Sequence, residues 1–123
     1  MGLRVPFKTI LRELVESIPG ATGAIIADWE GEAVEQHTLY DDYELKVIAA
    51  HKGIVLSRIR EVHAAFPGEE VHYALITTAS QHILTGFVGP DYSLVLTLDR
   101  GAVVGFALYR FRKALKILEK EIC

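Results

Sequence analysis

The sequence predicts an α/β protein of the α+β type, a three-layer α/β/α sandwich built on a five-stranded antiparallel sheet. Apolar residues recur with the helical period of about 3.6 near the start, in the middle and near the end of the chain. Between these segments lie five short stretches with the composition of amphipathic strands. Every direct strand-to-strand link is short, which favours an antiparallel sheet. Five amphipathic strands with helices on both faces make a three-layer sandwich. The predicted order of elements is α-β-β-α-β-β-β-α.

The first helix is predicted to begin with Pro6 in its first turn, where a missing N–H is harmless, and to end at Pro19-Gly20. Its apolar face comprises Phe7, Ile10, Leu11, Leu14 and Ile18. Strands are expected over residues 21–28 and 32–38, joined by a turn that begins with Asp28 and ends with a glycine. The second of these strands alternates weakly, which is typical of an edge strand with one wet face.

A central helix is predicted over residues 42–66, with Asp41 as its N-cap and Glu44 at the capping-box position. The pattern gives this helix two apolar faces. The main stripe, expected to cover the sheet, comprises Leu45, Ile48, Ala49, Val55, Leu56, Ile59, Val62 and Phe66. A second seam has the spacing of a narrow helix–helix contact and comprises Val47, Ala50, Ile54 and Ser57. Since a lone domain needs one buried face, we expect a partner helix on the second seam.

Three more strands are predicted over residues 71–78, 81–88 and 92–98, followed by a helix over residues 101–121 with Asp99 as its N-cap. The buried stripe of this last helix is expected to comprise Val104, Ala107, Leu108, Phe111, Leu115 and Leu118. Its solvent-facing residues are expected to be Arg110, Lys113, Lys116 and Lys120.

The composition predicts a single domain over residues 1–123, with a net charge of −3 that argues against a dedicated nucleic-acid binder. The only cysteine is Cys123, so no intrachain disulfide is expected, as in a reducing compartment. The sequence shows no signal peptide and no apolar run long enough for membrane insertion. We therefore expect a cytoplasmic protein.

Two features of the sequence resemble the roadblock family. One is the order of elements, and the other is the stretch of residues 14–31, which reads Leu-Val-Glu-Ser-Ile-Pro-Gly-Ala-Thr-Gly-Ala-Ile-Ile-Ala-Asp-Trp-Glu-Gly. That family includes dynein light chains, lysosomal scaffold subunits and bacterial gliding-motility regulators. The resemblance covers nearly the whole chain, and the linear order carries most of its weight. It implies the roadblock/profilin-like version of the three-layer fold.

The resemblance also implies a dimer in which third strands pair edge to edge and central helices pack side by side. Carried onto this chain, the pairing edge comprises Val71, His72, Tyr73, Ala74, Leu75 and Ile76, and the helix seam is the one defined above. Bacterial and archaeal members often act on a Ras-like small GTPase through the paired central helices. The residues expected at that partner surface are His51, Arg58 and Glu61.

Catalytic chemistry is not expected. The five histidines show no metal-ligand spacing, so neither a metal nor a cofactor is predicted. They are His37, His51, His63, His72 and His82. Gly86-Phe87-Val88-Gly89 lacks the lysine of a Walker motif, and the carboxylate pairs at 28/30 and 41/42 are explained by turn and cap chemistry. His51 at a partner surface would make assembly sensitive to pH. Arg58 is interpreted as solvated or ion-paired, with an arginine finger as the alternative.

The leading functional hypothesis is a homodimeric, non-enzymatic regulator or scaffold for a Ras-like GTPase. The alternative is a structural adaptor of a cytoskeletal or membrane-associated complex that leaves the nucleotide cycle unchanged. A third hypothesis, a small-molecule sensor, requires a cavity between sheet and helix, and the many large apolar residues argue against one.

Overall fold

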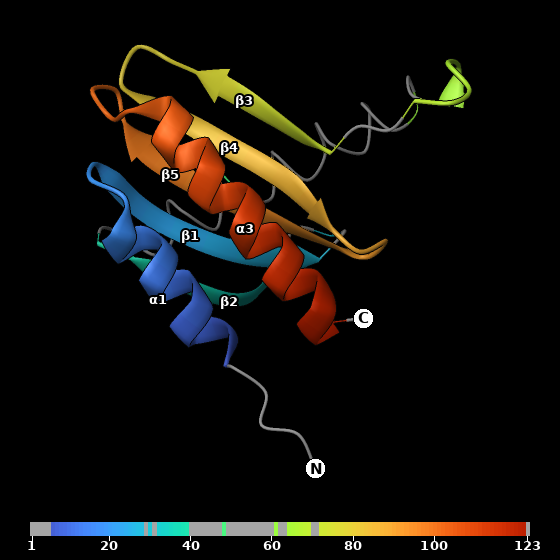
Figure 1. The fold of residues 1–123 in the computed structure, drawn as a ribbon, viewed down its shortest axis with the longest axis horizontal. Coiled ribbons are helices and arrows are strands. Elements are labelled where there is room, and N and C mark those ends of the chain that lie inside the picture. The colour runs from blue at the N-terminus through green and yellow to red at the C-terminus, as the bar shows by residue number, and fades with distance from the viewer. Residues whose placement is uncertain are drawn as a thin grey trace.

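The computed structural model describes residues 6–28, 30, 32–39, 48, 61, 64–69 and 72–122 (Figure 1). Its elements are α1 (Phe7–Ser17), β1 (Ala21–Asp28), β2 (Ala33–Thr38), β3 (Tyr73–Thr77), β4 (Gln81–Val88), β5 (Tyr92–Asp99) and α3 (Val104–Ile122). The strands form one antiparallel sheet in the order β2-β1-β5-β4-β3. The predicted sheet is confirmed, with β2 and β3 at its two edges.

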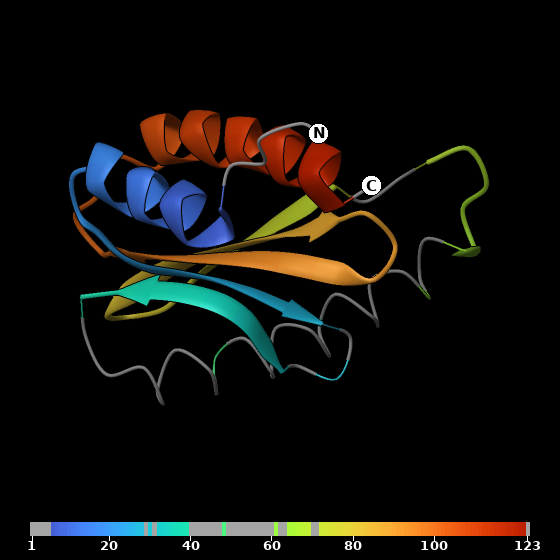
Figure 2. The same ribbon diagram turned by 90° about the horizontal axis from the view of Figure 1, so that it is seen from below.

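Helices α1 and α3 lie side by side on one face of the sheet (Figure 2). The core between them and the sheet is built from the predicted stripes and the alternating leucines of β5. Its largest fully buried members on this face include Leu11, Ile26, Leu94, Leu96, Phe111 and Leu118. Val15 and Ala114 are buried as well, although the predicted stripes omit them.

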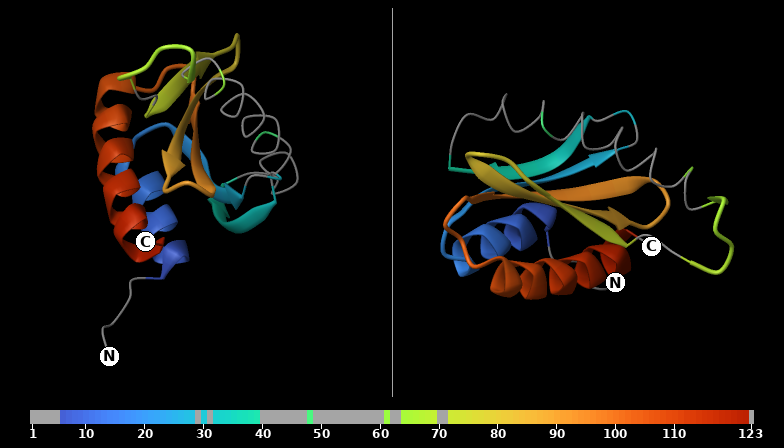
Figure 3. Two further views of the ribbon diagram at one scale, coloured as in Figure 1. Left: turned by 90° about the vertical axis from the view of Figure 1, so that its right-hand side faces the viewer. Right: turned by 90° about the horizontal axis from the view of Figure 1, so that it is seen from above.

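The opposite face of the sheet carries a second, smaller core. Alternation in the strands turns Ile25, Ala27, Ile83 and Val95 to this side, and each is at most 3% exposed. Ile48, one of the predicted stripe residues, is helical and packs against this cluster. Helices α1 and α3 cover one face of the sheet (Figure 3), and the helical residue Ile48 packs on the other, which confirms the three-layer class.

The turn after β1 follows the predicted aspartate chemistry. Asp28 Oδ1 accepts hydrogen bonds from the backbone N–H groups of Glu30 at 2.9 Å and Glu32 at 3.0 Å. The Asp28 N–H in turn donates to the carbonyl of Glu32 at 3.0 Å. One carboxylate thus fixes the reversal from β1 to β2.

Three local predictions are wrong. Pro6 is the residue before α1, and its carbonyl accepts the N–H groups of Thr9 and Ile10. Asp99 is the last residue of β5 and caps no helix, because its carbonyl closes a turn with the N–H of Ala102 and α3 begins only at Val104.

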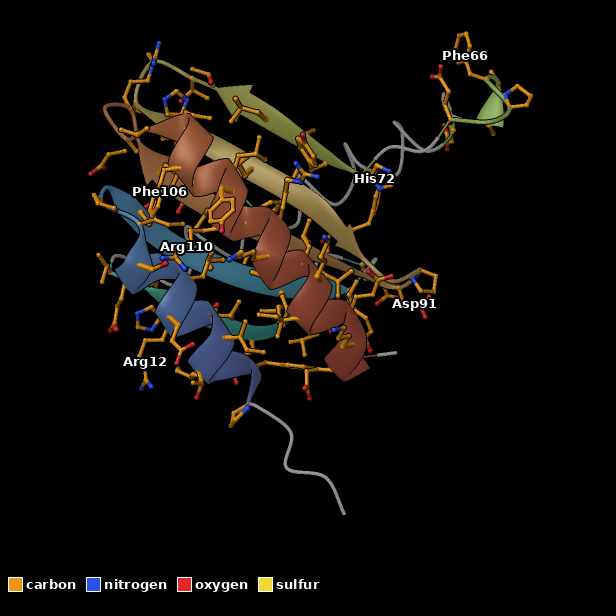
Figure 4. All side chains as sticks on the ribbon, viewed as in Figure 1. Arg12, Phe66, His72, Asp91, Phe106 and Arg110 are labelled. Carbon is orange, nitrogen blue, oxygen red and sulfur yellow. The ribbon has the colours of Figure 1, made fainter. Side chains whose placement is uncertain are left out.

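The third is Phe66, which was expected in the stripe that covers the sheet but is 59% exposed. It follows the last described helical residue of its segment, Ala64, and lies in a turn away from the sheet (Figure 4). The rest of the predicted central helix, apart from Ile48, Glu61, Ala64 and Ala65, lies outside the described residues. Within the described residues, no helix combines the length and apolar character needed to cross a bilayer.

Candidate protein–protein interface

Strand β3 is an edge strand whose side chains are unusually apolar for that position. Tyr73 is 37% exposed and Leu75 is 46% exposed, although both are large and apolar. The strand pairs with β4 on one side, in the register that places Tyr73 opposite Gly86 and Leu75 opposite Leu84. An exposed apolar edge of this kind invites pairing with another strand.

The hydrogen-bond pattern shows which backbone groups of β3 point away from the sheet. The N–H of Phe87 donates to the carbonyl of His72 at 3.3 Å, and that of Thr78 donates to the carbonyl of Gln81 at 2.9 Å. Hydrogen-bonded pairs alternate along an antiparallel ladder, so residues 74 and 76 also direct their N–H and C=O groups at β4. The N–H and C=O groups of residues 73, 75 and 77 therefore point outward, along the open edge.

The two faces of β3 differ. Ile76 packs with the second core, on the face that Ile48 contacts. Tyr73, Leu75 and Thr77 consequently lie on the opposite face, the one that carries α1 and α3. Helix α3 packs over β4, where Leu115 and Phe111 approach Gly86. The outer part of this face, at the β3 edge, keeps its large side chains exposed.

The structure describes only part of the predicted interface. His72, Tyr73, Ala74, Leu75 and Ile76 lie on or next to the edge strand, as predicted, with His72 exposed just before β3 (Figure 4). Glu61 is helical and exposed. The remaining predicted residues lie outside the described part of the chain: Val47, Ala50, His51, Ile54, Ser57, Arg58 and Val71.

His82 has a structural role. His82 is 6% exposed, and its Nε2 lies 3.0 Å from the carbonyl of Arg100 while its Nδ1 lies 2.8 Å from Thr77 Oγ1. Since a carbonyl only accepts, Nε2 carries a proton, and His82 ties the β3–β4 hairpin to the turn before α3. Among the described residues, no group of three or more His, Cys, Asp or Glu side chains could hold a metal ion.

A second exposed apolar surface lies on the outer side of α3, and the sequence prediction missed it. We call it the α3 outer face. Its large apolar members are Val103, Phe106, Tyr109 and Ile117, between 39% and 70% exposed. Two basic side chains lie over its rings, Arg110 at 5.4 Å from the Phe106 centroid and Lys113 at 4.6 Å from that of Tyr109. The signal in the sequence was the presence of two aromatic residues outside the predicted buried stripe.

The chain was compared with protein families and with solved structures. The family model described as the Roadblock/LC7 domain matches residues 8–98. No curated protein sequence matches the chain.

Solved structures share the fold. A Roadblock/LC7 domain from Streptomyces avermitilis superposes with a TM-score of 0.85 at 19% identity, over 96% of this chain and 98% of the other. The gliding protein MglB from Thermus thermophilus gives a TM-score of 0.81 at 15% identity, over 92% and 85%. Profilin IA from Acanthamoeba castellanii gives 0.66 at 14% identity, over 96% and 100%. With a family model that spans most of the sheet and its first helix, the chain belongs to the Roadblock/LC7 domain family.

Proposed function

We propose that this protein is a homodimeric, non-enzymatic regulator or scaffold that binds a Ras-like small GTPase. The observation that carries the proposal is the β3 edge, with outward backbone groups at residues 73, 75 and 77 and exposed Tyr73 and Leu75 beside them. A second copy is the simplest partner for this edge, because an isologous contact pairs the same strand with itself.

Pairing of two β3 strands sets the geometry of the proposed dimer. Antiparallel pairing of identical strands requires a two-fold axis perpendicular to the sheet. The two five-stranded sheets would then form one continuous sheet of ten strands. The α1/α3 layers of both copies would lie on one side of it, and the two smaller cores on the other. The seam of Val47, Ala50, Ile54 and Ser57 would meet its symmetry mate on that second side.

The proposed mechanism involves binding alone. A dimer surface that includes His51, Arg58 and Glu61 would bind one nucleotide state of the GTPase more tightly than the other and shift its population. A tenfold preference requires a difference of about 1.4 kcal/mol in binding free energy, which a few side-chain contacts supply. This mechanism needs no catalytic side chain on the present chain.

The edge pairing has a sharp test in Leu75→Pro. Proline removes an N–H that points outward, so the β3–β4 ladder keeps its hydrogen bonds while the open edge loses one. The matched control is Leu75→Ala, which shortens the same side chain and retains the N–H. We expect light scattering to report monomers for Leu75→Pro and dimers for Leu75→Ala. A wild-type protein that is monomeric at micromolar concentration would contradict the proposal.

The helix seam has its own test. Ile54→Asp places a charge in the proposed contact and should also shift the protein toward monomer. An unchanged mass would show that this seam is not part of the dimer interface, and the proposed pairing of the β3 edges would still stand.

The GTPase proposal is tested with the cognate small GTPase loaded with GDP or with a GTP analogue. We expect a complex whose affinity differs at least tenfold between the two states. Equal affinity would favour the adaptor function, in which the nucleotide cycle is unchanged. Arg58→Ala should leave the rate of any stimulated hydrolysis within a few-fold of wild type. A loss of rate on the order of 10³-fold or more would instead identify Arg58 as an arginine finger.

A further inference from the structure

The charges of this chain are unevenly distributed. Residues 100–122 contain six basic and two acidic residues, a net charge of +4, while the rest of the chain holds seven basic and fourteen acidic residues. Between Arg100 and Leu118 there is no aspartate or glutamate. A net acidic protein thus has one strongly basic segment, and that segment comprises α3 and the turn before it.

The exposed apolar residues gather on the same segment. Four of the nine large apolar side chains that are exposed in the described residues belong to the α3 outer face. The most exposed is Val103 at 70%, followed by Tyr109 at 53%. Single exposed apolar residues are ordinary, but a group of them among cations on one helix marks an interaction surface.

The arrangement of these side chains is regular. Phe106, Arg110, Lys113 and Ile117 follow one another at spacings of four, three and four, so they form one stripe along the helix. The cation–ring contacts lay Arg110 over Phe106 and Lys113 over Tyr109. Lys113 and Tyr109 are both exposed, so a cationic head and an aromatic ring are presented together, as on helices that lie in a membrane interface. Arg110 is half-buried beside the exposed ring of Phe106, and its Nε is buried without a hydrogen-bond partner.

The position of the helix favours a flat partner. Helix α3 lies on the outside of the molecule, next to α1 (Figures 2 and 3). An exposed amphipathic helix that lies along the outside of a domain can rest in the plane of a membrane interface. Phe106 and Arg110 lie on α3, whereas Arg12 projects from α1 on the side away from α3 (Figure 4).

We propose that the α3 outer face binds the surface of an anionic lipid bilayer. The basic residues supply attraction to acidic headgroups, and Phe106, Tyr109 and Ile117 supply the apolar contact at the interface. The binding is peripheral, because α3 is anchored to the sheet through Ala107, Phe111 and Leu118, each fully buried. In the dimer proposed above, both α3 helices would face the same bilayer and the GTPase surface would face away from it.

The first experiment is co-sedimentation with vesicles of phosphatidylcholine containing about 30 mol% phosphatidylserine, with pure phosphatidylcholine as the reference. We expect binding to the anionic vesicles alone, weakening at least tenfold when salt is raised from about 0.1 M to about 0.5 M. Absence of binding to the anionic vesicles at low salt would overturn the proposal.

Matched charge reversals locate the surface. The α3 variant is Lys113→Glu with Lys116→Glu, and the control is Lys8→Glu with Arg12→Glu, which changes the net charge equally from helix α1. We expect the α3 variant to lose at least tenfold in vesicle affinity and the control to stay within threefold of wild type. Equal losses would show that net charge alone is responsible and would overturn the assignment to α3.

The apolar contribution has a spectroscopic test in Phe106→Trp. Its emission, after subtraction of the unsubstituted protein's, should shift to the blue on anionic vesicles and stay unchanged on neutral ones. A shift induced by a polyglutamate peptide and absent with vesicles would identify an acidic protein segment as the partner and overturn the proposal. We expect the Leu75→Pro variant to bind anionic vesicles more weakly than the wild type but still measurably. That result would show that vesicle binding does not require the proposed dimer.

Discussion

A Cβ atom placed on Gly86 would lie 2.9 Å from Cδ1 of Leu115, which belongs to the helix that covers this strand. The same position is 3.0 Å from Cε2 of Phe111 and 3.2 Å from the carbonyl oxygen of His72. The absence of a side chain in β4 therefore lets α3 pack closely against the sheet. This contact fixes the height of α3 above the sheet, and with it the position of the exposed α3 outer face.

We expect Gly86→Val to destabilise the protein by about 2 kcal/mol, because the added methyl groups enter a closely packed core. Strand propensity alone predicts the opposite sign, since β-branched residues favour strands. The free energy of unfolding from urea denaturation decides between them. The control is Gly105→Ala in α3, where an added Cβ meets no atom within 4 Å. That variant should be neutral or gain up to about 1 kcal/mol.

Two threonines that are far apart in the chain form a buried pair, with Thr22 Oγ1 2.7 Å from Thr97 Oγ1. The Thr97 hydroxyl donates to the carbonyl of Gly23 at 3.3 Å, so Thr22 must donate to Thr97. We expect Thr97→Val to cost about 1–2 kcal/mol, because it leaves the Thr22 hydroxyl buried without its acceptor. Adding Thr22→Val should recover part of that loss in a double-mutant cycle of unfolding free energies. Strictly additive losses would show that the pair is not coupled.

Gly20 combines a positive φ of 90° with a close neighbour, since an added Cβ would lie 2.9 Å from the Cβ of Ala102. We expect Gly20→Ala to lower the unfolding free energy by about 2 kcal/mol, through backbone strain and this contact together. Ala102→Gly in the same chain removes this closest contact and leaves the strain and the 3.3 Å approach to the Ala102 Cα, so it should restore part of the stability. If the second substitution restores nothing, the Cβ of Ala102 does not contribute to the loss.

The sequence predicted what depends on regular patterns. Leu94, Leu96 and Leu98 alternate in β5, and this alternation placed them correctly on one face of the sheet. Asp28 was expected to begin its turn, and in the structure one of its carboxylate oxygens accepts two neighbouring N–H groups. In such cases the signal lies within a few residues of the feature it specifies.

The features that periodicity could not predict depend on contacts between residues distant in the sequence, or on two local signals that compete. Asp99 has the side chain of an N-cap, but pairing with Gln81 extends β5 to include it. The edge position of β3 follows from the order of all five strands, and the resemblance to a known family identified it where periodicity could not. The role of Gly86 was invisible because it depends on Leu115, in a different element. The helix seam and the proposed GTPase surface stay predictions.

Tyr109 offers a test of the α3 outer face that needs no partner. A hydrogen bond from Lys113, helped by the charge of that lysine, lowers the pKa of Tyr109 below its ordinary value of 10.0. A depressed pKa means that the phenolate is favoured in the folded state, so its contribution to stability is present above pH 10 and is lost as the pH falls through the lowered pKa. Below the lowered pKa the phenol is neutral in both the folded and the unfolded state, so it contributes no such stability there.

Ultraviolet titration of the tyrosines should therefore show one group that ionises early, and Tyr109→Phe should remove it. Lys113→Met should raise the pKa of Tyr109 back toward its ordinary value, because it removes the hydrogen bond and the nearer charge and leaves only the smaller effect of Arg110. Lys116→Met, a loss of the same charge elsewhere on α3, is the matched control and should leave the early ionisation in place. An unchanged pKa of Tyr109 in Lys113→Met would show that Lys113 does not hold its ammonium against Tyr109, and these two side chains of the α3 outer face would then have to be treated as independent.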